Sequence, residues 1–129
     1  MPAHVLYPNI DPNPAGFSPF WIQQILRQEL KFNGTVFSDD LSMAGAATAG
    51  DFPERARLAQ EAGCDMLLVC NNPDAAEQVL DSLPITEDPI REQRLRRMQG
   101  KPGDSKACKN TEKWQQTSLL INQLIENHA

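Results

Sequence analysis

A short apolar run that ends in two carboxylates constrains the fold more than any other stretch of the chain. Residues 35–37 read Thr-Val-Phe and are followed directly by Ser38, Asp39 and Asp40. The run does not alternate between apolar and polar residues, as a strand with one solvent-exposed face would. A continuous apolar run is typical of a parallel strand covered on both sides. The sequence therefore predicts a buried parallel strand over residues 35–38 that delivers acidic side chains at its carboxyl end, where α/β folds place their chemistry.

The same strand-and-helix pattern recurs on both sides of this run. Residues 3–7 are predicted to form a first strand, which Pro8 ends, and residues 66–70 a third, continuously apolar strand. Helical spacing of apolar residues predicts a helix between the first two strands, which Asn33-Gly34 is expected to close, and another over residues 53–62, with Gly63 as its terminator. A further helix is predicted to begin after Asn72, a good capping residue. The order β-α-β-α-β-α indicates an α/β fold with a parallel sheet and right-handed crossovers.

The chain changes character after Pro84. Residues 86–98 are predicted to form a charged helix with few apolar anchors, and Thr111 is predicted to cap a last helix. We expect residues 1–85 to form βα units of one domain and residues 86–129 to form terminal helices of the same domain. Four arginines are expected on a solvated face of the charged helix: Arg91, Arg94, Arg96 and Arg97.

Composition narrows the possible partners and the compartment. The 129 residues carry a net charge of -5, with a pI of about 4.9, so nucleic acid and anionic lipid are poor electrostatic matches. The sequence predicts no membrane-spanning segment and no signal peptide, which favours a cytoplasmic location. The three cysteines, Cys64, Cys70 and Cys108, lack CxxC spacing and are expected to be reduced thiols. No metal site is expected from these cysteines and two distant histidines.

Four residues are candidates for chemistry. Asp39 and Asp40 are adjacent, so on an extended backbone they point to opposite sides and cannot form a facing acid/base pair. Asp39 is the leading candidate, with a loop cap as the alternative. His4, in the first predicted strand, is either a hydrogen-bonded core group or a binding residue. Asp65 precedes the third strand, at the wrong end for chemistry, and is predicted to be a turn residue.

Five segments together resemble a known family. The resemblance is to bacterial β-N-acetylhexosaminidases of glycoside hydrolase family 3, and Ser-Asp-Asp-Leu-Ser-Met is its most specific part. Such enzymes are (β/α)₈ TIM barrels of about 250 residues. The resemblance implies a partial barrel that comprises the last three βα units plus C-terminal helices, that is, only the C-terminal portion of the enzyme. The segments are Ala3-His4-Val5-Leu6-Tyr7-Pro8, Ser18-Pro19-Phe20-Trp21, Leu26-Arg27-Gln28-Glu29-Leu30, Phe37-Ser38-Asp39-Asp40-Leu41-Ser42-Met43 and Ala62-Gly63-Cys64-Asp65-Met66.

The resemblance also implies site roles. Asp39 matches the nucleophile of a retaining mechanism, Asp40 would support it, and His4 would bind substrate. The family's acid/base histidine, its aspartate partner and its Lys-His-Phe-Pro-Gly-His-Gly sugar-binding signature are absent from the 129 residues. We therefore expect this chain alone to be inactive, with a missing N-terminal barrel portion needed to complete the site.

The function implied for the intact enzyme is removal of β-linked N-acetylglucosamine from peptidoglycan-derived muropeptides during cell-wall recycling in the cytoplasm. No metal or organic cofactor is expected. The alternative is a non-catalytic, truncated βα module that binds a sugar or a partner chain.

Overall fold

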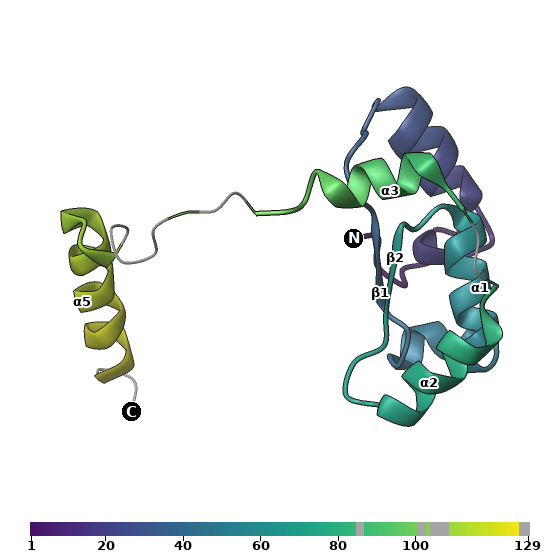
Figure 1. The fold of residues 1–129 in the computed structure, drawn as a ribbon. Coiled ribbons are helices and arrows are strands. Elements are labelled where there is room, and N and C mark those ends of the chain that lie inside the picture. The colour runs from purple at the N-terminus through teal and green to yellow at the C-terminus, as the bar shows by residue number, and fades with distance from the viewer. Residues whose placement is uncertain (85–86, 101–102, 104–108, 127–129) are drawn as a thin grey trace. The chain divides into compact units, whose positions relative to one another are not determined.

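A computed structural model describes residues 1–84, 87–100, 103 and 109–126, and the chain divides into two compact units, Met1–Gln99 and Gly100–Ala129 (Figure 1). In the second unit, the described structure is helix α5 (Glu112–Glu126). Helices dominate the first unit, which also holds a two-stranded sheet. Its elements are η1 (Ala15–Phe17), η2 (Phe20–Glu29), β1 (Phe37–Asp40), η3 (Ala44–Ala49), α1 (Phe52–Ala62), β2 (Met66–Leu68), α2 (Pro73–Ser82) and α3 (Pro89–Arg96).

The sheet pairs β1 with β2 in parallel, as predicted for the second and third strands. Phe37 pairs with Met66 and Asp40 with Leu68, so the register shifts between the two pairs. The shift coincides with Ser38, a buried residue whose hydroxyl accepts a hydrogen bond of 2.9 Å from the Leu68 amide. The two strands therefore end side by side, which places the segments after Asp40 and after Leu68 close together.

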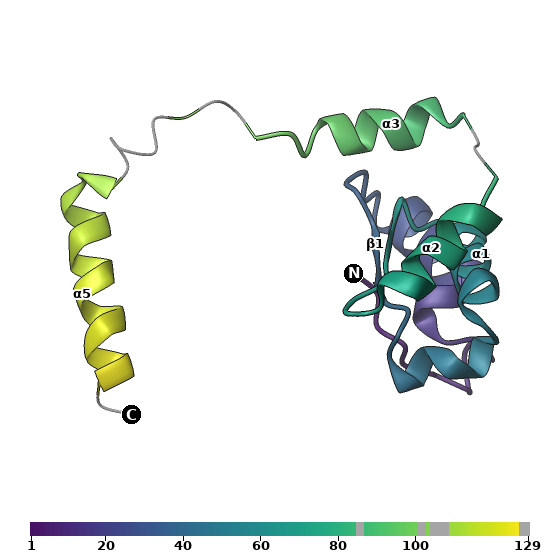
Figure 2. The same cartoon turned by 60° about the horizontal axis from the view of Figure 1, so that its bottom comes forward.

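Helices α1 and α2 lie on the same side of the two strands in both views (Figure 1, Figure 2). Helix α1 begins at the predicted place because the Asp51 carboxylate accepts a hydrogen bond of 2.9 Å from the Glu54 amide. It ends at Gly63, whose φ of 113° is a left-handed conformation that suits glycine. The buried core lies between these helices, the sheet and η2, and consists of Phe17, Ile22, Val36, Leu41, Ala46, Ala56, Ala59, Ala62, Cys64 and Val79.

The prediction of a strand over residues 3–7 is wrong. Apart from an isolated bridge between Tyr7 and Asp11, this segment joins no ladder among the described residues. Its carbonyl groups are taken by the turn that contains η1: Ala15 donates to Val5 at 2.9 Å, and Gly16 donates to Ala3 at 3.2 Å. The described residues thus contain two paired strands where three were expected. They form an α-rich unit around a small sheet, so a partial TIM barrel is not established by this structure.

The predicted first helix is present but has an unexpected form. Helix η2 is a π-helix, and the chain leaves it through Lys31, whose φ is 54°. The predicted ending at Asn33-Gly34 is therefore wrong, because the left-handed residue comes earlier. A Cβ at Gly34 would lie 2.6 Å from the Phe32 ring, so a larger residue here would require that exposed ring to shift.

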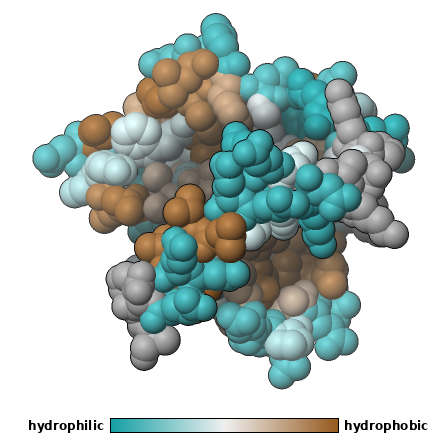
Figure 3. Space-filling view, turned by 90° about the vertical axis from the view of Figure 1, so that its left-hand side faces the viewer, coloured by the Kyte–Doolittle hydropathy of each residue, from teal (hydrophilic) through white to brown (hydrophobic). Residues whose placement is uncertain are grey.

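Many large apolar side chains remain exposed, and brown patches separated by teal are visible on the face in Figure 3. Among the described residues, no helix is long and apolar enough to cross a membrane. Large exposed apolar patches mark interaction surfaces more often than accidents of folding. In the first unit, the exposed apolar residues include Val5, Leu6, Tyr7, Ile10, Leu30, Phe32, Met43 and Met66.

Candidate active site at the carboxyl end of the sheet

Asp39 lies on β1 one residue before its carboxyl end, close to the strand end where the sequence predicts it, although the strand runs from Phe37 to Asp40 and not from Thr35 to Ser38. The residue is half-buried, and its Oδ1 accepts a hydrogen bond of 2.9 Å from the Asp40 amide. A carboxylate in this position keeps oxygen lone pairs available, because one amide uses only part of its capacity. The structure therefore puts an accessible carboxylate where a parallel sheet presents its functional groups.

The Asp40 carboxylate has quite different surroundings. Its Oδ1 accepts from the amides of Ser42 at 2.9 Å and Cys70 at 3.0 Å, and its Oδ2 accepts from the Ser42 hydroxyl at 2.6 Å. Burial raises the pKa of this carboxyl, but the hydrogen bonds from Ser42 and Cys70 outweigh burial and hold the pKa below its ordinary value. Asp40 is thus held ionised by donors from both strand ends.

The His4 ring contacts the same strand end, but it reaches the backbone of Asp40 and not a carboxylate. Its Nε2 lies 3.1 Å from the Asp40 carbonyl oxygen, and because a carbonyl can only accept, Nε2 is the donor. The ring stacks on Phe17 at 5.0 Å, and its buried Nδ1 has no protein partner. Gly45 makes room for this arrangement, since a Cβ there would lie 3.0 Å from the His4 Cβ. The predicted role of His4 in binding substrate remains a prediction.

Two described cysteines differ in their surroundings. Cys64 is buried, and burial raises the pKa of its thiol to about 11. Cys70 is exposed, and desolvation followed by the Asp40 charge raises the pKa of its thiol. In the part of the chain that the structure describes, no group of three or more histidine, cysteine or acidic residues could hold a metal ion. Neither thiol has the lowered pKa of a reactive nucleophile.

The opposite end of the sheet holds a charge cluster that the sequence did not reveal. The Asp65 carboxylate forms ion pairs with Arg27 at 2.7 Å and with Arg94 of α3 at 2.9 Å. It also accepts from the Val36 amide at 2.7 Å, and its side chain is only 3% exposed. The prediction that Arg94 lies on a solvated face is wrong, because this residue ties α3 to the start of β2. Asp65 is likewise more than a turn residue.

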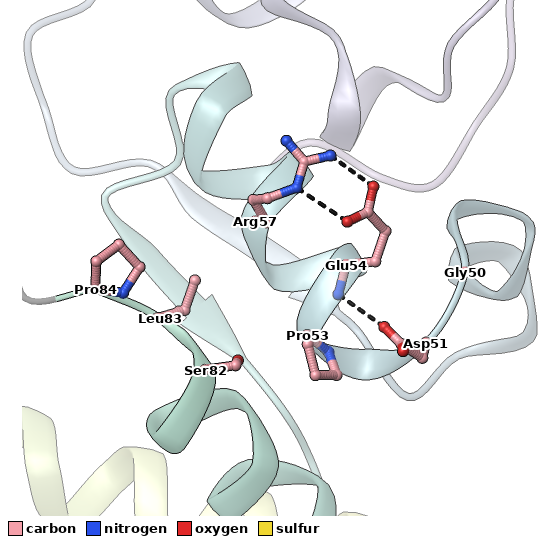
Figure 4. A pocket seen from close by; sticks show the side chains of 8 residues that line it. All are labelled: Gly50, Asp51, Pro53, Glu54, Arg57, Ser82, Leu83 and Pro84. Atoms are coloured by element: carbon pink, nitrogen blue, oxygen red, sulfur yellow. Dashed lines mark hydrogen bonds and ion pairs between the residues drawn. The ribbon is translucent and has the colours of Figure 1, made fainter.

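A hollow of about 550 Å³ lies away from Asp39 and Asp40 and is lined by Gly50, Asp51, Pro53, Glu54, Arg57, Ser82, Leu83 and Pro84 (Figure 4). Its charged groups already have partners. Arg57 pairs with Glu54 at 2.5 Å and with Glu61 at 2.6 Å, while Asp51 caps α1. An arginine compensated by two carboxylates presents little net positive charge to an anionic ligand. The carboxyl end of the sheet therefore remains the better candidate site.

Comparison with known proteins identifies the class to which this fold and site belong. The family described as "Glycosyl hydrolase family 3 N terminal domain" matches residues 1–99. This match covers most of the chain, and the chain therefore belongs to glycosyl hydrolase family 3.

Particular relatives are called beta-hexosaminidase. The protein from Idiomarina loihiensis is 59% identical over 124 residues, which are 94% of this chain and 37% of the relative. The protein from Thioalkalivibrio sulfidiphilus is 51% identical over 128 residues, 98% of this chain and 37% of the relative. A crystal structure of NagZ from Neisseria gonorrhoeae in complex with N-trifluoroacetyl-D-glucosamine has a TM-score of 0.79 at 40% identity, and covers 96% of this chain and 35% of that one.

These comparisons correct one part of the sequence-based resemblance. The family was predicted correctly, but the assignment to a C-terminal portion is overturned by the match to the domain described as N-terminal. The chain spans about 37% of the length of the two curated relatives.

Proposed function

We propose that this chain supplies the nucleophile of a retaining β-N-acetylhexosaminidase site, with Asp39 as that nucleophile. Asp39 would attack the anomeric carbon of a β-linked N-acetylglucosamine, and the bond to the leaving oxygen would break as the glycosyl–Asp39 ester forms. Water would then hydrolyse the ester with net retention. The observation that carries the proposal is a half-buried carboxylate at the carboxyl end of a parallel strand. This carboxylate accepts a hydrogen bond from the Asp40 backbone amide.

The 129 residues alone are proposed to be inactive. The resemblance implies a histidine–aspartate acid/base pair that these residues do not provide, and His4 is committed to the Asp40 carbonyl. General acid catalysis contributes on the order of 10²–10⁴-fold, and departure of the leaving group depends on it. Activity is therefore proposed for a longer polypeptide that contains these residues together with an acid/base pair.

The substrate and its setting are finer parts of the same proposal. By resemblance, the substrate is a muropeptide that carries N-acetylglucosamine, and the setting is cell-wall recycling in the cytoplasm. The NagZ structure from Neisseria gonorrhoeae is a complex with an N-acylated glucosamine, which supports the sugar class. A substrate-binding role for His4 remains part of the proposal, although its Nε2 donates to the Asp40 carbonyl and its Nδ1 is buried.

The decisive test uses a chimera. The 129 residues replace the matching segment of the relative from Idiomarina loihiensis, which is 59% identical over 124 residues. Hydrolysis of a chromogenic β-N-acetylglucosaminide is measured for the chimera, for its Asp39→Ala variant and for the 129-residue chain. We expect activity in the chimera, a loss on the order of 10⁴-fold or more in Asp39→Ala, and none in the short chain.

Asp81→Asn is the matched control, because Asp81 is exposed on α2 and the change also removes one negative charge. A chimera that stays active without the Asp39 carboxylate would refute the nucleophile assignment. Activity in the 129-residue chain alone would refute the need for a separate acid/base pair.

A second candidate, a non-catalytic module that binds a partner chain, is favoured by one observation. An apolar hollow of about 580 Å³ lies between the N-terminal segment and η2, and its lining includes Tyr7, Ile10, Trp21, Ile25 and Leu30. The chimera separates the two functions, because a binding module would not restore hydrolysis to the host protein.

A further inference from the structure

We propose that Asp40 is a positioning residue: it fixes the carboxyl ends of β1 and β2 relative to each other and so holds Asp39 in its attacking orientation. The inference rests on the nucleophile role proposed for Asp39. It concerns a residue whose carboxylate is engaged by hydrogen bonds from Ser42 and Cys70.

Several hydrogen bonds to different parts of the fold meet at Asp40. Its amide donates to the Asp39 carboxylate at 2.9 Å, and its carbonyl accepts from His4 at 3.1 Å. Its carboxylate accepts from the amides of Ser42 and Cys70, and from the Ser42 hydroxyl. One residue is therefore joined to the candidate nucleophile, to the N-terminal segment and to the segments that follow both strands.

The bond from the Cys70 amide extends the sheet by side-chain contact. The ladder at this end includes a bond of 2.8 Å from the Leu41 amide to the Leu68 carbonyl, and β2 ends at Leu68. Two residues further along, the Cys70 amide is bound by the Asp40 carboxylate at 3.0 Å. The Asp40 carboxylate thus accepts a hydrogen bond beyond the end of β2, as a backbone carbonyl would within the ladder. This bond holds the segment that follows β2 next to β1.

The charge on Asp40 suits this role. Hydrogen bonds from Ser42 and Cys70 outweigh the effect of burial and keep the pKa of Asp40 below its ordinary value, so the carboxylate stays a strong acceptor near neutral pH. A nucleophile must meet its target within a narrow range of distance and angle, and a misplacement of about 1 Å costs on the order of 10²-fold in rate. We call the hydrogen bond between the Asp40 carboxylate and the Cys70 amide the clamp. Loss of the clamp should therefore lower kcat.

The first experiment measures the clamp in the 129-residue chain itself. Hydrogen exchange of the Cys70 amide is followed by NMR in the wild type, Asp40→Ala, Asp40→Asn and the exposed control Asp81→Asn. We expect protection of the Cys70 amide to fall at least about tenfold in Asp40→Ala and less in Asp40→Asn, because asparagine keeps one acceptor oxygen. The control should match the wild type. Equal protection in Asp40→Ala and the wild type would overturn the proposal.

The second experiment measures the catalytic consequence in the chimera with the Idiomarina loihiensis host. With active protein corrected by the folded fraction, we expect Asp40→Ala to lower kcat about 10–100-fold and to leave KM within about twofold. Asp40→Asn should recover part of the loss, since it restores the acceptor for the Cys70 amide. An unchanged kcat, or a higher KM at unchanged kcat, would overturn the positioning role.

The two proposals fail in different ways. If Asp39→Ala keeps its activity, the nucleophile assignment falls and the positioning role falls with it. If Asp39→Ala is inactive while Asp40→Ala keeps the kcat of the unmodified chimera, only the positioning role is overturned.

Discussion

The two ends of the β1–β2 sheet each hold a carboxylate that bridges the strands, but they compensate its charge differently. At the amino end, Asp65 is 3% exposed and lies between the guanidinium groups of Arg27 and Arg94. At the carboxyl end, the half-buried Asp40 takes its hydrogen bonds from two amides and a hydroxyl. Positive charge therefore neutralises the first carboxylate, whereas uncharged donors support the second.

This difference separates stability from chemistry. A buried carboxylate between two arginines has its charge neutralised inside the fold, and it can do little for a ligand. At the other end, the hydrogen bonds to the Asp39 and Asp40 carboxylates come from uncharged amides and a hydroxyl, so these bonds do not neutralise the negative charge. Catalytic groups collect at the carboxyl ends of barrel strands, and residues at the amino ends serve stability. The two carboxylate clusters of this chain follow that division.

The largest effect on stability is expected at Asp65. Asp65→Ala removes the carboxylate partner of Arg27, whose side chain is 8% exposed, and of Arg94, whose side chain is 18% exposed. Removal of one member of a buried ion pair costs about 3–5 kcal/mol. The free energy of unfolding, measured by urea titration, should fall by that amount. The exposed Asp81→Asn serves as the control. A loss as small as that of the control would contradict the assignment of Asp65 as the ionic centre of the amino end.

The next effect is expected at Arg94. Helix α3 has no fully buried residue, and the polar contacts that attach it include Arg94 to Asp65 and Arg97 to the Asn33 carbonyl at 2.6 Å. A hydrogen bond to a charged group contributes about 1.5–3 kcal/mol, and Asp65 retains Arg27 as a partner. Arg94→Ala should therefore lower the free energy of unfolding by less than Asp65→Ala does. Hydrogen exchange of the α3 amides should accelerate more than that of α1; equal acceleration in the two helices would show that Arg94 does not specifically hold α3.

Local signals predicted much of what the structure contains. The apolar runs indicated both strands, although β1 begins at Phe37 and not at Thr35. Gly63 ends α1 as predicted, and Asn72 caps α2 through a bond of 3.1 Å from the Ala75 amide. Asp39 could be placed near a strand end because it follows the apolar run at residues 35–37 after only one residue. In each case, the information lies within a few residues of the feature.

The remaining features depend on partners that are distant in sequence. Asp65 is 38 residues from Arg27 and 29 from Arg94, so neither pair leaves a local pattern. The links from Asp40 to His4 and Cys70 likewise span 36 and 30 residues. Residues 3–7 have the composition of a strand, but a strand also requires a neighbour, and the turn at η1 takes the carbonyl groups that a neighbour would use.

A smaller effect, confined to acid, is expected at Asp40. Its pKa in the folded chain lies below the ordinary 3.8, so its contribution to stability is present above that value and is lost as the pH falls through the lowered pKa. Asp40→Asn cannot lose a charge in this range. The difference in Tm between the wild type and Asp40→Asn should therefore shrink as the pH falls from about 6 to about 3. A constant difference over that range would show that the Asp40 charge is not what binds Ser42 and Cys70.

The smallest effect is expected at Arg57, which tests whether ion pairing alone explains the contrast between the two ends. Arg57 pairs with two carboxylates, as Asp65 pairs with two arginines, but its side chain is 47% exposed. Exposed pairs gain little because water solvates both charges and salt screens them. Arg57→Gln should shift Tm less than the variants at Asp65, Arg94 and Asp40 do, and the shift should vanish at about 1 M salt, whereas the Asp65→Ala loss should persist. A loss at Arg57 comparable to that at Asp65 would mean that the number of partners, and not burial, determines the strength of these clusters.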